Sequence, residues 1–147
     1  MQNQLERLVD YFRTLNTAAD FSPTAVPTDL LPIVYVLDIE ASPELLRLKI
    51  RLTGTALDIA FGRSVTGKYL EEFMHGPRGA DVLAGFRQCA KAKNAIWMRQ
   101  TVRIKDNLPR YVEGVAFYVV PDRIYGGLIV GELHSQVSDN SFELIEL

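Results

Sequence analysis

The sequence is poor in the residues on which covalent and metal chemistry most often depends. Its 147 residues include one cysteine, Cys89, and two histidines, His75 and His134. A single cysteine excludes an internal disulfide and suits a reducing compartment. Neither histidine is followed at the third or fourth position by a histidine, a cysteine or a carboxylate. The sequence therefore shows no metal-binding spacing.

Charge and hydropathy argue against two further classes of protein. The formal net charge is −2, whereas a general nucleic-acid binder needs a surplus of cations to displace counterions from phosphates. No stretch approaches the roughly 18 uncharged apolar residues of a membrane span. The segment from Met1 to Leu15 is charged throughout and lacks the apolar core of a signal peptide. We expect a cytoplasmic protein with no membrane span and no nucleic-acid partner.

What is present fits one domain preceded by an amphipathic helix. A chain of 147 residues matches the commonest domain size. Close to the N-terminus, apolar residues recur at intervals of three and four and so share one helical face: Leu5, Leu8, Phe12 and Leu15. We predict an N-terminal helix and linker over residues 1–22, a folded domain over 23–137 and a C-terminal tail over 138–147.

Five segments have the pattern of β-strands, and their two faces differ. Residues 33–39, 110–120 and 125–133 are apolar on both faces, which is typical of central strands. Residues 45–53 and 96–105 alternate apolar side chains with cations, which indicates edge strands with one wet face. Helical segments separate the second strand from the third. This order predicts an antiparallel α+β sheet with helices clustered on one face.

Two features resemble chemical motifs. Residues 62–69 fit the phosphate-binding loop G-x-x-x-x-G-K-[ST], except that Tyr69 stands where a short hydroxyl side chain should hold magnesium. We interpret this segment as a glycine-bounded turn between helices. Cys89 shares the apolar face of the longest central helix with Val82 and Phe86, so we expect a buried and unreactive thiol.

The order and spacing of several short motifs resemble the bacterial single-domain PAS family (PAS_5 type). These motifs are Arg51-Leu-Thr-Gly54-Thr55, Phe61-Gly62-Arg-Ser-Val-Thr66-Gly67, a leader with the turn Asp29 to Pro32, and a late strand from Arg110-Tyr111 to Val120-Pro121. The resemblance implies a PAS-like five-stranded antiparallel sheet of order 2-1-5-4-3. It also implies helices on one face, with the N-terminal helix packed on the other face or against a second copy.

The resemblance names no ligand, and the cofactor stays unknown. Flavin-binding PAS domains carry a reactive cysteine within Asn-Cys-Arg, whereas Cys89 stands in Arg-Gln-Cys-Ala. If a small molecule binds between sheet and helices, we expect inward-facing residues to line its pocket. The candidates are Leu52, Phe61, Phe73, Phe86, Met98, Phe117 and Ile129.

We interpret the chain as a stand-alone signalling domain, not an enzyme, that acts through a protein partner or through dimerisation. The predicted homodimer uses the helix face of Leu5, Leu8, Phe12 and Leu15 to cover the apolar sheet, with an unidentified signalling protein as the further partner. One alternative is a small-molecule sensor. The other is a small enzyme on a related α+β cone fold, which would need a titratable pocket group such as His75 or Asp58.

Overall fold

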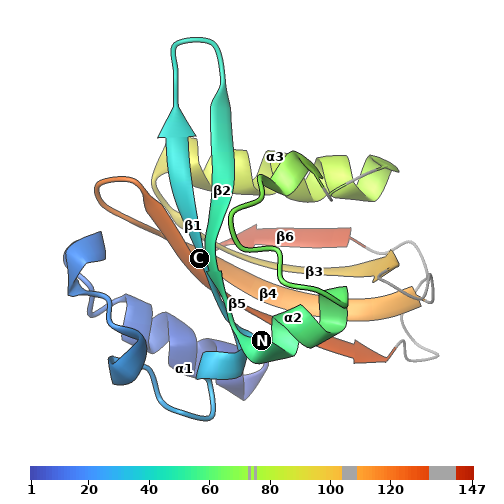
Figure 1. Cartoon of the computed structure of the whole chain (residues 1–147), viewed down its shortest axis with the longest axis horizontal. Helices are drawn as coiled ribbons and strands as arrows, with labels where there is room; N and C mark the ends of the chain where they lie inside the picture. Colours follow the sequence, from blue (N-terminus) through green and yellow to red (C-terminus); the bar gives the residue numbers. More distant parts are fainter. Residues whose placement is uncertain (73, 75, 104–108, 133–141) are drawn as a thin grey trace.

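The computed structural model describes residues 1–72, 74, 76–103, 109–132 and 142–147. Six strands form one antiparallel sheet in the order β2-β1-β5-β4-β3-β6 (Figure 1). Their bounds are Val34–Ala41 (β1), Leu46–Thr53 (β2), Ala95–Arg103 (β3), Pro109–Val119 (β4), Arg123–Glu132 (β5) and Phe142–Glu146 (β6). The predicted α+β class and the order 2-1-5-4-3 are confirmed, with one strand added beyond β3.

The added strand corrects two predictions. Residues 138–147 were expected to be a tail, but β6 lies within them and pairs with β3. The predicted edge strand β3 is therefore an interior strand. Its cation Arg99 pairs with the Glu143 carboxylate of β6 at 2.6 Å, and both side chains stay partly exposed. Strand β6 has only five residues, two of them glutamates, so its hydrophobic pattern is too weak to predict a strand from the sequence alone.

Helices cover the sheet on both faces. The inner face carries α2 (Thr55–Phe61), the short turn η4 (Leu70–Glu72) and α3 (Gly76–Ala92), whose apolar residues join one core cluster. The outer face carries α1 (Asn3–Phe12) and the turn η1 (Ala18–Asp20), whose buried residues belong to a second cluster, and the turn η2 (Pro23–Ala25) follows without a buried residue of its own. A third turn, η3 (Leu31–Ile33), leads into β1. The predicted clustering of helices, with the N-terminal helix opposite, is confirmed.

Helix α3 presents the predicted apolar face to the sheet. Val82, Phe86 and Cys89 are all buried there. The residue in left-handed geometry after the helix is Lys93, with φ of 55°. The next residue, Asn94, offers its backbone carbonyl to the amide of Tyr118 on β4, which ties the helix end to the sheet.

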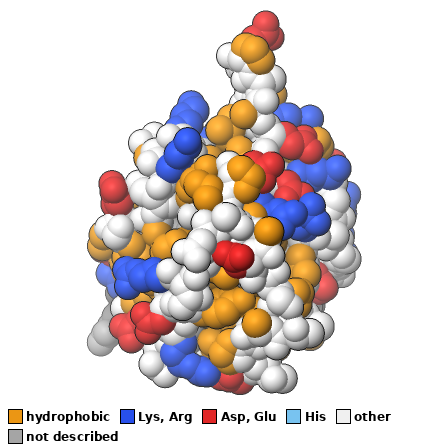
Figure 2. Space-filling view, turned by 90° about the vertical axis from the view of Figure 1, so that its left-hand side faces the viewer, with side chains coloured by type: hydrophobic (Ala, Val, Ile, Leu, Met, Phe, Trp, Pro, Cys, Tyr) orange, Lys and Arg blue, Asp and Glu red, His pale blue; other side chains and the backbone are white. Residues whose placement is uncertain are grey.

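The segment that resembles a phosphate-binding loop, residues 62–69, is a turn, as predicted. Gly62 ends α2 in left-handed geometry, with φ of 76°. The next glycine, Gly67, donates its amide to the Ile50 carbonyl on β2, and Ile50 donates in turn to Lys68. The segment therefore covers part of the outer edge of β2. Seen from one end, the β1–β2 hairpin projects from the body with charged side chains beside it (Figure 2).

Candidate functional site

The face of the sheet beneath α1 is the candidate site. It is lined by apolar residues of the central strands, together with the buried side chains of the helix. Leu5, Leu8 and Phe12 of α1 have no exposed surface. The helix thus covers its own sheet, which the sequence left open. Because these three side chains are buried within one chain, they offer no exposed dimer interface, and a dimer built on them requires α1 to leave the sheet.

A glycine on β5 makes room for the helix. Gly127 lies on the outer face, where a Cβ would collide with the Leu8 side chain and touch Leu5. Its neighbour Gly126 faces the other way, and a Cβ there would collide with the ring of Tyr35. Adjacent glycines thus let a helix and an aromatic ring approach the same strand from opposite sides.

A buried carboxylate on β4 holds the N-terminal end of α1. Glu113 lies among the apolar residues of the outer face and is only 4% exposed. Its Oε1 accepts hydrogen bonds from the Trp97 indole at 3.0 Å and from the Gln2 backbone amide at 2.8 Å. The Gln2 side-chain amide donates to Oε2 at 3.3 Å. Gln2 is the residue that caps α1, so the carboxylate also lies at the positive end of the helix.

These contacts determine the charge state of Glu113. Burial raises the pKa of the carboxyl, but the hydrogen bonds from Trp97 and Gln2 outweigh burial and lower the pKa from its ordinary value. The carboxyl is therefore ionised at neutral pH. A buried charge of this kind is tolerated only while its hydrogen-bond partners stay in place. The docked helix and the ionised carboxylate consequently stabilise each other.

Aromatic rings hold the C-terminal end of α1. The ring of Phe12 lies 6.0 Å from Tyr125 and 6.2 Å from Phe117, and Phe21 stacks on Tyr125 at 4.5 Å. The Tyr125 hydroxyl donates to the carbonyl of Ala18 at 3.0 Å. The helix is thus attached at both ends, by a polar contact at the start and by aromatic packing at the finish.

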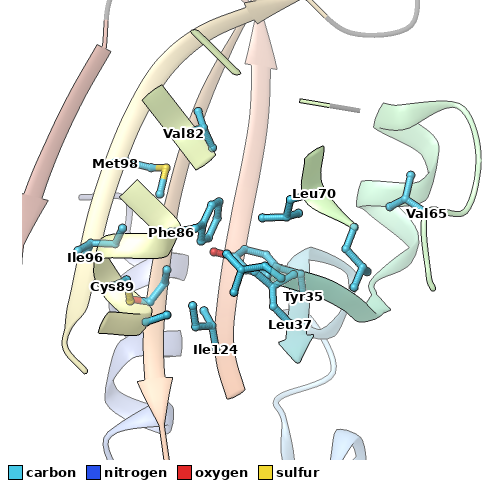
Figure 3. Packing of buried hydrophobic residues seen from close by; sticks show 14 of the residues in the cluster. Tyr35, Leu37, Val65, Leu70, Val82, Phe86, Cys89, Ile96, Met98 and Ile124 are labelled. Atoms are coloured by element: carbon cyan, nitrogen blue, oxygen red, sulfur yellow. The ribbon is translucent and has the colours of Figure 1, made fainter. Parts of the chain in front are cut away.

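On the inner face, buried side chains of the sheet, α2, η4 and α3 form one core cluster. Tyr35 lies at its centre, with its hydroxyl donating to the Val115 carbonyl at 2.7 Å (Figure 3). The ring of Phe86 from α3 meets it edge-on at 5.9 Å. Complete burial raises the pKa of Tyr35 well above its ordinary value. Tyr35 is therefore a structural hydrogen-bond donor at the centre of the core.

The predicted pocket residues divide between the two faces. Phe61, Phe86 and Met98 belong to the inner cluster as expected. Leu52, Phe117 and Ile129 belong to the outer cluster with α1, so the prediction that they face inward is wrong. Phe73 lies outside the described residues, as do His75 and His134.

The three wrong assignments have two physical causes. A register shift beside Leu37 places Leu52 opposite Val36, whereas Ile50 is opposite Leu37. The irregularity therefore turns Leu52 away from the face that strict alternation assigns to it. For Phe117 and Ile129 the strands are apolar on both sides, so alternation does not say which side faces inward.

Cys89 does not fit flavin adduct chemistry. Its thiol donates to the backbone carbonyl of Asn94 at 3.1 Å. Burial raises the pKa of this thiol to about 12, so the nucleophilic thiolate is scarce at neutral pH. The expectation of a buried cysteine is confirmed, its lack of reactivity stays a prediction, and no step through a flavin follows from these residues.

Of the residues proposed for the enzyme alternative, the structure describes Asp58 and not His75. The Asp58 carboxylate accepts a hydrogen bond from the Thr53 hydroxyl at 2.6 Å, across the start of α2. Among the described residues, no three His, Cys, Asp or Glu side chains are placed to share a metal ion. Within the same residues, no helix is long and apolar enough to cross a membrane.

Sequence reasoning missed the two residues that matter most at this site, Glu113 and its partner Trp97. One signal was available. Glu113 is a lone carboxylate in the middle of a strand that is otherwise apolar on both faces, and such a residue is buried only when it has a partner. The only tryptophan of the chain lies on the neighbouring strand.

Comparisons with known proteins bear on the fold. No family model matches the chain, and no curated protein is significantly similar to it. The chain resembles the solved structure of a fungal LOV domain photoreceptor, described in connection with a pathway integrating blue light and oxidative stress. The similarity has a TM-score of 0.56 at 15% sequence identity, over 90% of this chain and 92% of that one. The chain therefore has the fold of PAS and LOV domains.

Proposed function

We propose that the chain is a PAS-type regulatory domain in which α1 is a displaceable cover over an apolar sheet face. When α1 leaves, the face presents its apolar residues to an amphipathic helix of a protein partner. The observation that carries this proposal is the Glu113 contact. An otherwise apolar interface is closed at one end by an ionised carboxylate that bonds to Gln2 at the helix start and to Trp97 on the sheet.

The physical properties of α1 support its role as a switch. A ten-residue helix is marginal in water by itself, so α1 is helical chiefly because it is docked. Undocking therefore couples to loss of helical structure, an order-to-disorder change of the kind many signalling proteins use. The chain after α1 stays anchored, because Ala18 bonds to both Val120 and Tyr125. Undocking can consequently stop at Asn16 without opening the rest of the domain.

Three finer assignments belong to the same proposal. We place the chain in the bacterial single-domain PAS family (PAS_5 type), in the cytoplasm, and among proteins that signal without catalysing a reaction. The support is the motif order of the sequence together with a PAS and LOV fold.

The test is to displace α1 from the sheet face and then to add a peptide that can bind there. Leu8→Lys places a charge at a buried position of α1, whereas Gln4→Lys adds the same charge at an exposed position of the same helix. We expect Leu8→Lys, but not Gln4→Lys, to remove hydrogen-exchange protection from α1 while β4 and β5 stay protected. A fluorescent peptide of residues 1–16 should then bind to the Leu8→Lys protein and not to the wild type. The proposal would be refuted if the whole domain of the Leu8→Lys variant unfolded, or if its exposed sheet face did not bind the peptide.

A second function, small-molecule sensing, is favoured by one observation. Gln100 on β3 shares the inner face with Met98 and is only 5% exposed. Its Oε1 has no hydrogen-bond partner among the described residues. A buried acceptor without a partner is costly, and a ligand donor would satisfy it. Native mass spectrometry of the purified protein tests this directly. A retained small molecule that Gln100→Met abolishes supports the sensor, and a bare chain speaks against it.

A further inference from the structure

The free edge of the sheet is formed by β6. This strand pairs with β3 on one side, and no described residue pairs with its other side. Leu147 donates its amide to Ala95 on β3 at 2.8 Å. Because backbone groups point alternately to either side along an antiparallel strand, the N–H and C=O groups of Leu144 and Glu146 point away from β3. These two residues thus offer two donors and two acceptors at the edge.

Apolar side chains accompany these free backbone groups. Leu144, Ile145 and Leu147 are 36%, 46% and 42% exposed. Since side chains alternate along a strand, Leu144 lies toward the α3 side of the sheet, whereas Ile145 and Leu147 lie toward the α1 side. An exposed edge with apolar residues on both faces is a template for another strand.

The opposite edge of the sheet, formed by β2, is protected from pairing with another strand. Backbone bonds from residues 67 and 68 cover part of β2. Two of the three cations of β2 are also engaged in ion pairs, Arg47 with Glu71 at 2.7 Å and Arg51 with Asp38 at 3.0 Å. Among the described residues, no backbone hydrogen bonds cover the outer edge of β6, and the strand itself has no cationic side chain. The two margins of the sheet are visible in Figure 1.

We propose that β6 pairs antiparallel with β6 of a second copy of this chain, joining two sheets into one. In the register we infer, the symmetry axis passes between the two Ile145 residues. Leu144 then lies opposite Glu146 of the other copy, and Glu143 opposite Leu147. Each Leu144–Glu146 pair exchanges two backbone hydrogen bonds, so four bonds form in all.

Charge supports this occupant and this register. Each carboxylate faces a leucine and never another carboxylate, so no like charges stand directly opposite each other. Glu143 also keeps its own ion pair with Arg99, because both lie on the α1 side of the sheet. The three exposed apolar side chains each lose part of their exposed surface when the strands pair. The dimer needs no movement of α1 and is therefore independent of the proposed function.

The experiment uses charge reversal on the axis. Ile145→Lys and Ile145→Glu each place like charges opposite each other, and each should be monomeric in sedimentation equilibrium where the wild type dimerises. Mixing the two variants should restore a dimer, because lysine then faces glutamate. Ile145→Thr is the matched control and should dimerise with at most a few-fold loss of affinity. Circular dichroism of each variant shows that loss of the dimer is not loss of the fold.

A second pair of variants tests the backbone contact itself. Glu146→Pro removes an outward N–H without removing a bond to β3, so it should abolish the dimer. Glu146→Thr keeps that N–H and should not. A wild type that stays monomeric, or a mixture of charged variants that stays monomeric, overturns the proposal. So does a dimer that Leu8→Lys abolishes while the Ile145 variants leave it intact, because this result would assign the interface to the α1 face.

Discussion

Replacing Glu113 with alanine is the most direct perturbation of the helix cover. The substitution removes the acceptor of the Trp97 indole and of the Gln2 amide, and it leaves the apolar contacts of Leu5, Leu8 and Phe12 in place. The docked state then contains a buried indole N–H without a partner. Undocking α1 exposes that group to water, so the variant favours the undocked state.

The expected size follows from the two strong hydrogen bonds. A buried donor left without a partner costs about 1–3 kcal/mol, and a hydrogen bond to a charged group contributes about 1.5–3 kcal/mol. Gln2 is exposed and regains part of its bond from water. We therefore expect docking of α1 to weaken by roughly 2–4 kcal/mol, equivalent to a rise of roughly 30- to 1,000-fold in the opening equilibrium.

Two measurements report the opening of α1. Hydrogen exchange of the α1 amides should accelerate by this factor while the amides of β4 and β5 keep their protection. Trp97 is the only tryptophan and is 9% exposed, so its emission should shift to the red. Glu6→Ala removes an exposed carboxylate from the same helix and is the control. If Glu113→Ala changed α1 exchange no more than Glu6→Ala does, the carboxylate would not hold the helix.

Three further predictions concern the same face and the thiol. The pKa of Glu113 is lowered in the folded chain, so its contribution is complete above its ordinary value of 4.5 and is lost as pH falls through the folded value. Acid should therefore release α1 in the wild type, and Glu113→Gln should remove this pH dependence of Trp97 emission; equal acid sensitivity in both proteins would contradict it. Gly127→Ala should lower stability by about 1–3 kcal/mol, read as a melting-temperature drop of about 2–4 °C per kcal/mol. Gly131→Ala on the same strand should be near neutral, because the nearest atom to its added Cβ lies 4.0 Å away, and equal losses would refute the packing argument. With its pKa raised to about 12, Cys89 should react with a thiol reagent only after unfolding in urea; rapid labelling of the native protein would show that the thiol is accessible.

The spacing of apolar residues within single segments predicted much of the fold. The interval of three and four residues through Leu5, Leu8 and Phe12 defined the buried face of α1, since a helix repeats every 3.6 residues. In the same way, Val82, Phe86 and Cys89 defined the buried face of α3. Strands apolar on both sides were recognised as central for a similar reason. Residues covered by helices above and below have no wet face to reveal.

Other features depended on contacts that no local pattern encodes. A bulge reversed the facing of Leu52, and Phe117 and Ile129 lie on strands whose two faces look alike in sequence. The strand β6 exists because β3 offers it an edge and Arg99 offers Glu143 a partner.

The sequence by itself determined the α+β class, the division into central and outer strands and the buried faces of the two longer helices, because each follows from the period of apolar residues along one segment, whereas the strand order was implied by the resemblance to PAS domains. Only the tertiary structure decided which face each central strand shows to α1. It alone brought Glu113, Trp97 and Gln2 together from three separate segments. The reason is physical. A buried carboxylate is stable only among its hydrogen-bond donors, and those donors lie 16 and 111 residues away along the chain.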